Sequence, residues 1–253
     1  MEERSTQPGG TERPIPAADE PTRAPGPDHL ADPRALTILT TEHWSLLTAR
    51  SLVYNEAFAR TGMFLTFLSA SLVALALVAQ GMGFDRDFLL LAAVILAFDL
   101  FIGLATLGRV SSASNEDLRS IAGMNRIRNA YLEIAPGLTP YFIASRFDDV
   151  PGVLATYGEA ADEPPDRLGS FVHGLTTTNG MVAVITTAIG GILGAVVALL
   201  AGLPPGTAIA LGVITFVVMF GAVLSSALRS FTRFGNRLDP RFPTPPVERG
   251  RRG

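Results

Sequence analysis

The chain has 253 residues, of which 48% are hydrophobic and 17% are charged, and its formal net charge is −3. Soluble domains have about 25% charged residues, so this composition excludes an ordinary soluble globular protein, and the small net charge argues against a nucleic-acid partner. The sequence contains no Cys, which excludes disulfides, iron–sulfur clusters and cysteine nucleophiles.

The N-terminal residues 1–35 are rich in Pro, Gly and charged side chains and have almost nothing apolar to bury. Such a composition is typical of intrinsic disorder, so we expect a disordered tail. The tail lacks the apolar core of a secretory signal peptide.

Residues 36–60 are predicted to form a cytoplasmic helix that continues into the first transmembrane span. Thr40 or Thr41 is a suitable N-cap, and Glu42 then lies in the first turn, where a negative charge suits the helix dipole. No Pro or Gly interrupts this run before Gly62.

Residues 61–109 are expected to form the first transmembrane hairpin. Its apolar runs, 61–80 and 88–108, are each about 20 residues long, which is the length that crosses a bilayer core. The residues between them, 81–87, contain Gly and charged side chains and form a turn.

Residues 110–173 are expected to form a cytoplasmic layer of helices. Ser114 and Asp117 have the spacing of a capping box, so a new helix is predicted to start there. Apolar residues at helical spacing continue it, and Pro136 ends it.

The rest of this layer is predicted to consist of shorter pieces. Pro140 suits the first turn of a helix over 141–146, and a further piece reaches Tyr157. The pair at 148–149, Asp-Asp before Val-Pro, is typical of a turn or helix cap, with a cation site as the less common alternative. A last helix from residue 167 is expected to lead into the third span.

Residues 174–228 contain no Asp, Glu, Arg or Lys and are expected to form a second transmembrane hairpin. Its spans cover 180–201 and 207–228, and the Gly- and Pro-rich residues 202–206 break the helix between them. Residues 229–253 are expected to be a disordered C-terminal tail.

The Arg residues predict the orientation. Of the 20 basic residues, which are all Arg, every one except Arg86 lies on the same side of the predicted spans. The positive-inside rule assigns that side to the cytoplasm, so we expect a multi-pass protein of the cytoplasmic membrane with both termini in the cytoplasm. The absence of Lys is typical of GC-rich bacterial genes.

Asp99 is the only ionisable residue deep within a predicted span. A carboxyl group there is costly to bury, so it marks either a proton or cation site or a hydrogen bond that joins helices. The polar residues expected near the same depth are Ser69, Ser71, Thr186, Thr187 and Thr215.

Small residues form stripes along the spans, at positions that include Gly62, Gly190, Gly194 and Gly221. Such stripes let helices approach closely, either within one chain or between chains. We expect a homo-oligomer in the lipid bilayer. Because Gly is common throughout this sequence, the spacing of the glycines alone does not identify the contact.

The cytoplasmic stretch around Arg126, Arg128 and Glu133 is the most distinctive polar sequence. One hypothesis is recognition of a phosphate, a lipid head group or an acidic partner by the two Arg residues. The alternative is a solvated helix face with ordinary pairs such as Asn129–Glu133.

Motifs of known enzyme classes are absent from the sequence: there is no HExxH, no GxSxG and no Walker loop. We therefore expect a non-enzymatic membrane scaffold or sensor with a cytoplasmic interaction layer and no cofactor or metal. The alternative hypothesis is a channel or a proton- or cation-coupled transporter that uses Asp99.

Overall fold

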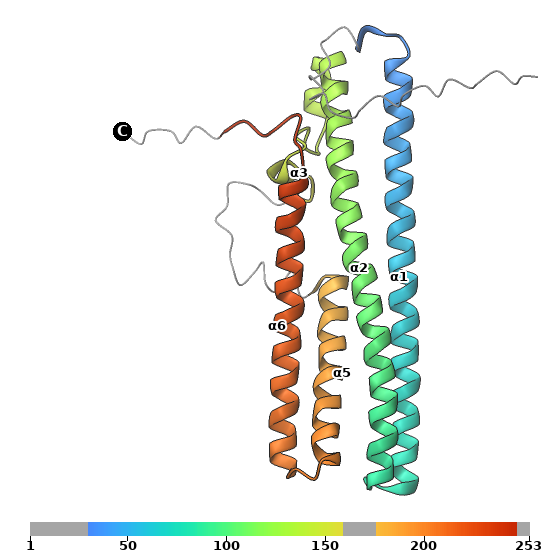
Figure 1. Cartoon of the computed structure of the whole chain (residues 1–253). Coiled ribbons are helices and arrows are strands. Elements are labelled where there is room, and N and C mark those ends of the chain that lie inside the picture. The colour runs from blue at the N-terminus through green and yellow to red at the C-terminus, as the bar shows by residue number, and fades with distance from the viewer. Residues whose placement is uncertain (1–29, 159–175, 247–253) are drawn as a thin grey trace, which may run out of the picture.

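The computed structural model describes residues 30–158 and 176–246, and this part of the chain is helical without any β-strand. Its elements are α1 (Ala35–Met82), α2 (Arg86–Ile134), the 3-10 helix η2 (Pro136–Tyr141), α3 (Val150–Thr156), α5 (Thr178–Leu200) and α6 (Pro205–Arg237) (Figure 1). The predicted all-α architecture is confirmed for these residues.

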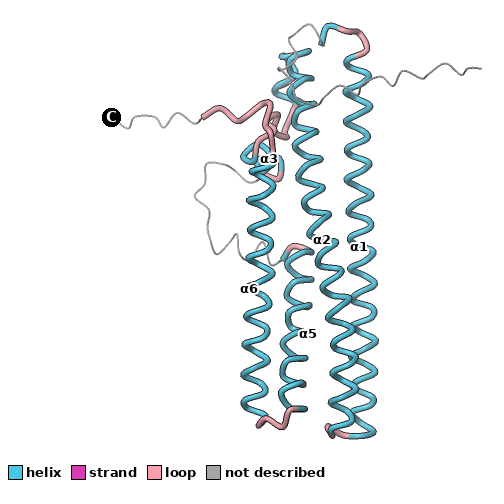
Figure 2. The backbone as a smooth tube through the Cα atoms, viewed as in Figure 1, coloured by secondary structure: helices cyan, strands magenta, loops and turns pink. Residues whose placement is uncertain are grey.

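The four helices α1, α2, α5 and α6 are long and apolar enough to cross a membrane, as predicted. Each packs along the next in the order α1, α2, α5, α6. The turns that join α1 to α2 and α5 to α6 lie at the same end of the bundle (Figures 1 and 2). We call this the turn end, and we call the opposite end, with residues 35–60, 110–158 and 229–246, the polar end.

Three apolar clusters hold the helices together, and the smallest, of Ala57, Val110 and Ala113, joins α1 to α2. The core of the turn-end half joins α1, α2 and α5 through Phe64, Leu96, Leu107, Val182, Ala183 and Ile189. The core of the polar end packs α3 against α2 through Ile121, Ala122, Met124 and Val153.

The helices α1 and α2 are much longer than a membrane crossing requires. They have 48 and 49 residues, or about 72 Å at 1.5 Å per residue, whereas the hydrocarbon core is about 30 Å thick. The predicted helix start at Ser114 is wrong, because α2 runs through it. The Ser114 hydroxyl donates to the Val110 carbonyl at 3.1 Å, which is how a Ser inside a helix satisfies its hydroxyl.

The helix α1 begins at Ala35, earlier than the predicted cap at Thr40 or Thr41. The Thr41 hydroxyl donates to the Thr37 carbonyl at 2.8 Å, so it lies within the helix. The 3-10 helix η2 ends at Tyr141, where sequence predicted a helix to begin.

The C-terminal tail does not begin at residue 229 as expected, because α6 continues to Arg237. The extra turns are held by tertiary contacts: Phe234 is buried, and Gly235 lies against Val150. The predicted helix from residue 167 and most of the predicted N-terminal tail lie outside the described residues.

Candidate functional site

Asp99 lies in the apolar half of α2 and is 1% exposed. The Ser71 hydroxyl of α1 donates to Asp99 Oδ1 at 3.0 Å, as the antiparallel alignment of the first two spans predicts. The other carboxylate oxygen, Oδ2, is buried without a protein partner, and so is the Thr186 hydroxyl of α5. Buried polar atoms are normally paired, so these two atoms can still bind a proton or a small polar ligand.

Gly103 explains how α5 comes so close to Asp99. It lies one turn after Asp99 on α2, and a Cβ atom there would approach the Thr186 hydroxyl oxygen to 2.8 Å and the Phe64 ring to 3.1 Å. The missing side chain therefore lets Thr186 lie against the same part of α2 that presents Asp99.

The other polar residues predicted around Asp99 do not bond to it. Their hydroxyls donate to carbonyl oxygens of their own helices: Ser69 to Leu65, Thr187 to Ala183 and Thr215 to Leu211, each at 2.8 Å. The site within the spans is therefore small, with Ser71 as its one bonded neighbour among the described residues.

The predicted packing glycines fall into two groups. A Cβ on Gly190 would lie 2.4 Å from the Met219 sulfur, and a Cβ on Gly194 would lie 2.8 Å from the Thr215 hydroxyl. These two glycines therefore pack α5 against α6 within the chain. A Cβ on Gly62 or Gly221 would meet nothing within 4 Å, so neither glycine packs inside the chain.

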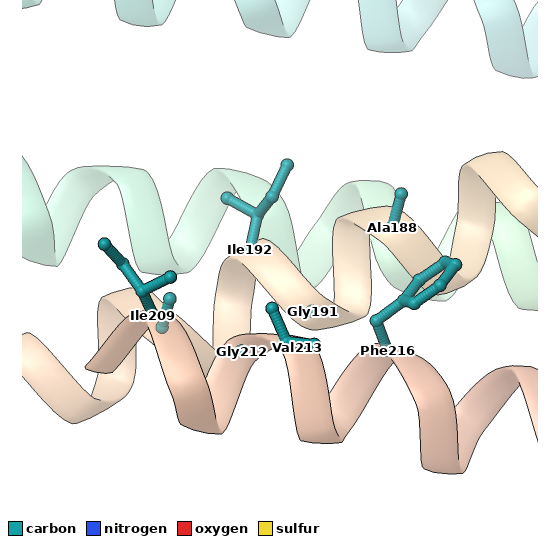
Figure 3. A pocket seen from close by; sticks show the side chains of 8 residues that line it. Ala188, Gly191, Ile192, Ile209, Gly212, Val213 and Phe216 are labelled. Atoms are coloured by element: carbon teal, nitrogen blue, oxygen red, sulfur yellow. The ribbon is translucent and has the colours of Figure 1, made fainter. Parts of the chain in front are cut away.

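An open groove of about 300 Å³ runs between α5 and α6 (Figure 3). The two helices meet beside it at Gly191 and Gly212, where a Cβ on Gly191 would come within 2.9 Å of the Gly212 carbonyl oxygen. Apolar side chains such as Ile192, Ile209 and Phe216 form its walls, so the groove offers no group for acid–base or metal chemistry.

At the polar end, Asp117 of α2 is 1% exposed and accepts hydrogen bonds from three side chains. The Tyr54 hydroxyl donates to Oδ2 at 2.9 Å, and Arg50 and the Tyr157 hydroxyl also donate to this carboxylate. The carboxylate therefore joins α1, α2 and the residue that follows α3.

The electrostatics of this cluster follow from its burial. Burial raises the pKa of both Tyr54 and Tyr157, and the neighbouring Asp117 carboxylate raises both further. Burial opposes the charge of Arg50, but its bond to Asp117 outweighs this, so the pKa of Arg50 is raised. At neutral pH both phenols are protonated donors to one carboxylate.

Sequence analysis missed this cluster, although it contained a signal. Asp117 precedes Ile121 by one helical turn and so lies on the face of α2 that the apolar spacing marks as buried. A carboxylate on a buried face requires donors, but their identity depends on α1 and on the end of α3.

Arg126, which one of the two hypotheses assigned to an external ligand, is bonded within the fold. It donates to the Asp148 carboxylate and to the Asp239 carbonyl. Asp148 is fully buried and also accepts from the backbone N–H groups of Arg241 at 2.9 Å and Phe242 at 2.8 Å. Residues 239–244, which we call the C-terminal strap, are thereby tied to the polar end.

Asp149 has both a local and a long-range role. It is the N-cap of α3 and accepts from the Gly152 N–H at 2.9 Å, so the predicted helix cap is confirmed. It also accepts from the Thr244 N–H at 2.7 Å and the Thr244 hydroxyl at 2.8 Å, which fixes the end of the strap.

Arg128 and Glu133 are also bonded within the chain. Arg128 donates to the Asn125 side chain, and Asn129 donates to Glu133 at 2.8 Å, which is the predicted intrahelical pair. Burial, followed by repulsion from Arg50, lowers the pKa of Arg128. The geometry thus favours the structural alternative for this stretch over a basic pocket for a ligand.

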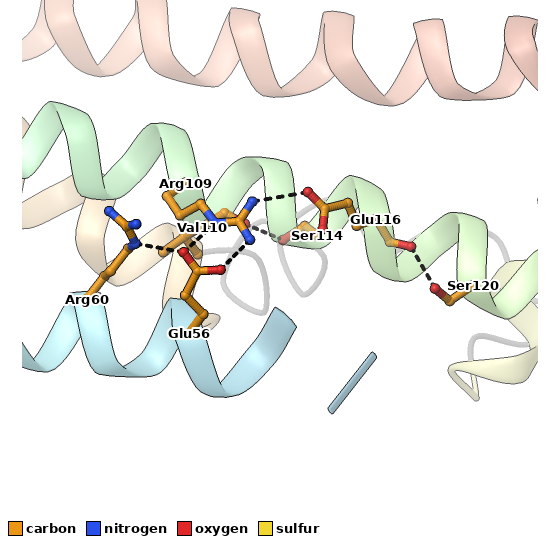
Figure 4. A network of polar contacts seen from close by, with 7 residues as sticks. All are labelled: Glu56, Arg60, Arg109, Val110, Ser114, Glu116 and Ser120. Atoms are coloured by element: carbon orange, nitrogen blue, oxygen red, sulfur yellow. Dashed lines mark hydrogen bonds and ion pairs between the residues drawn. The ribbon is translucent and has the colours of Figure 1, made fainter. Parts of the chain in front are cut away.

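A network of ion pairs joins α1 and α2 where their apolar halves end (Figure 4). Arg109 contacts Glu56 at 2.6 Å and Glu116 at 3.1 Å, and Arg60 contacts Glu56 at 2.9 Å. Hydrogen bonds from Arg109 and then Arg60 lower the pKa of Glu56. These exposed charges mark the level at which the apolar surface gives way to a polar one.

Within residues 30–158 and 176–246, no three His, Asp or Glu side chains come together as metal ligands. Comparison with protein families, with curated proteins and with solved structures finds no match for this chain. The function must therefore be inferred from the residues themselves.

Proposed function

We propose that this protein is a non-enzymatic scaffold or sensor of the bacterial cytoplasmic membrane, whose polar end recruits a cytoplasmic protein partner. The positive-inside rule supports this orientation, since Arg86 is the only Arg in a turn between predicted spans. In this topology both termini and the layer around α3 are cytoplasmic.

The observation that supports recruitment is an apolar tip at the far end of α2. Leu138 and Tyr141, in η2, and Ile143, just after it, are 45%, 78% and 104% exposed. Clustered apolar side chains in water are typical of interaction sites.

The segment that holds this tip, η2 and the residues around it, has internal hydrogen bonds. The Leu138 N–H donates to the Ala135 carbonyl at 3.0 Å, and the Thr139 hydroxyl donates to the Pro136 carbonyl at 2.8 Å. The segment is therefore organised in the free chain, which lowers the entropy cost of binding a partner.

Site-specific photo-crosslinking in cells tests this proposal. A photoreactive amino acid at Ile143 is expected to give a discrete protein adduct, and Tyr141→Ser in the same chain should remove it. The matched control is Phe84 at the turn end, which is 80% exposed and faces the opposite side of the membrane in this topology. No adduct at Ile143, or the same adducts at both positions, would overturn the proposal.

A second candidate function is proton or cation transport through Asp99, favoured by its unpaired Oδ2 atom. Purified protein in liposomes should then conduct protons or alkali cations, and Asp99→Asn should abolish the flux while the protein stays folded. The scaffold proposal expects no flux that depends on Asp99.

A further inference from the structure

The helix α1 lies at the edge of the bundle and is covered on one side only. It packs along α2, and no other described helix shares an extended contact with it. In its most apolar window 11% of residues are buried, compared with 44% in α5. Lipid explains this exposure within the membrane, but α1 extends well beyond a membrane crossing.

The exposed side of α1 has a regular spacing. Leu36, Leu47 and Phe58 are 11 residues apart, and the positions four and eight residues after each of them complete a 4-4-3 pattern that continues to Leu77. Eleven residues make about three helical turns, so these positions form one continuous strip, which we call the α1 seam. Every seam position is exposed and none is charged.

In the polar half of α1, the seam places large apolar side chains outside the predicted span. Leu36, Trp44 and Phe58 are 54%, 62% and 53% exposed. Burying such apolar side chains is favourable, so a protein surface that covers this half of the seam would form a stabilised complex.

Where the membrane half of α1 begins, the seam positions Gly62, Thr66 and Ser69 have small side chains. A Gly inside a helix is less favourable than Ala, and a Cβ on Gly62 would meet nothing in this chain within 4 Å. A hollow of about 300 Å³ between Met63, Thr66, Phe67 and Ala70 touches the seam at Thr66. Small residues beside a hollow are typical of close helix–helix approach in membranes.

We propose that α1 pairs with α1 of a second copy, side by side and in the same direction, along the α1 seam. Copies of one membrane protein share their orientation, so a two-fold pairing sets each seam position against its own counterpart. Such pairing excludes like charges from the seam, and the seam has none. Arg50, Glu56 and Arg60, which lie elsewhere on α1, are paired within their own chain.

The second copy also fits the extent of the seam. The seam has its large residues Leu36, Trp44 and Phe58 in the polar half and its small residues Gly62, Thr66 and Ser69 where the membrane half begins. The counterpart α1 has that order at the same depth by symmetry. This pairing stands independently of the proposed recruitment at the apolar tip.

Cysteine crosslinking tests the pairing cleanly, because the chain has no Cys. Ser51 lies on the seam and Ser45 lies on α1 off the seam, and both are exposed. In native membranes under mild oxidation, Ser51→Cys should form a disulfide-linked dimer about tenfold faster than Ser45→Cys, because pairing raises the local thiol concentration. Equal rates at the two positions, or no dimer at Ser51→Cys, would overturn the proposal.

A second pair of variants separates pairing from folding. A Cβ at Gly62 meets nothing in its own chain within 4 Å, yet Gly62→Leu should weaken Ser51→Cys crosslinking about tenfold by overpacking the seam. Gly221→Leu is the matched control on α6, where a Cβ is equally unopposed, and it should leave the crosslinking unchanged. Both variants are expected to melt like the parent. Undiminished crosslinking in Gly62→Leu would contradict close approach at the seam.

Discussion

Replacing Asp117 with Ala is expected to destabilise the polar end by about 3 kcal/mol. The carboxylate is 1% exposed and is the shared acceptor for Arg50, Tyr54 and Tyr157. Removing one partner of a buried ion pair costs about 3–5 kcal/mol, because the other charge stays buried and unpaired. The Arg50 side chain is 28% exposed, so water compensates in part and the lower end of that range applies.

The free energy of unfolding can be measured by urea titration in detergent, followed by the fluorescence of the sole Trp. That residue, Trp44, lies on α1 before Arg50 and reports on the polar half of the helix. Asp117→Asn should cost less than Asp117→Ala, about 2 kcal/mol, because its amide oxygen still accepts a hydrogen bond.

The control for this prediction is Asp239→Ala, which removes a carboxylate that is 88% exposed and should change stability by less than about 0.5 kcal/mol. A double replacement, Arg50→Met with Asp117→Leu, should recover most of the loss, since an apolar pair leaves no charge unpaired. A loss below about 1 kcal/mol in Asp117→Ala, the range of surface pairs, would refute the reasoning.

Three further changes test other contacts. Gly152→Ala sets a Cβ 2.2 Å from a backbone carbonyl oxygen. It should destabilise the protein by about 1–3 kcal/mol, which is measured as a lower melting temperature. Asp148→Asn should speed amide hydrogen exchange of Arg241 and Phe242 about tenfold, because their N–H groups donate to that carboxylate. Burial lowers the pKa of His43 below its usual 6.5, so its contribution to stability is complete above that pH and is lost on acidification. His43→Phe should therefore flatten the fall in melting temperature between about pH 7 and pH 5.

The sequence is sufficient to predict the four apolar helices, because span length and the cost of buried charge are properties of single segments. It is insufficient for helix ends. Ser114 precedes an acidic residue at capping-box spacing, yet the same hydroxyl is satisfied inside a continuous helix. The choice between these states depends on packing along the neighbouring helix.

The candidate sites divide in the same way. The contact between Ser71 and Asp99 follows from the antiparallel alignment of adjacent helices, so it is predictable. The contact between Asp148 and the C-terminal strap joins residues 93 positions apart and involves backbone N–H groups, which leave no pattern in side-chain chemistry. The partners of Arg126, the Asp148 carboxylate and the Asp239 carbonyl, are therefore not visible in the sequence.

The helix α2 continues without a break from its apolar half to the polar end. From Arg109, where the exposed ion pairs lie, to Ile134 at its end, the helix extends about 38 Å at 1.5 Å per residue. A change of about 10° in its tilt would move Ile134 sideways by about 7 Å. If α2 tilts in a bilayer, for example after a change in bilayer thickness, the apolar tip would move by several ångströms.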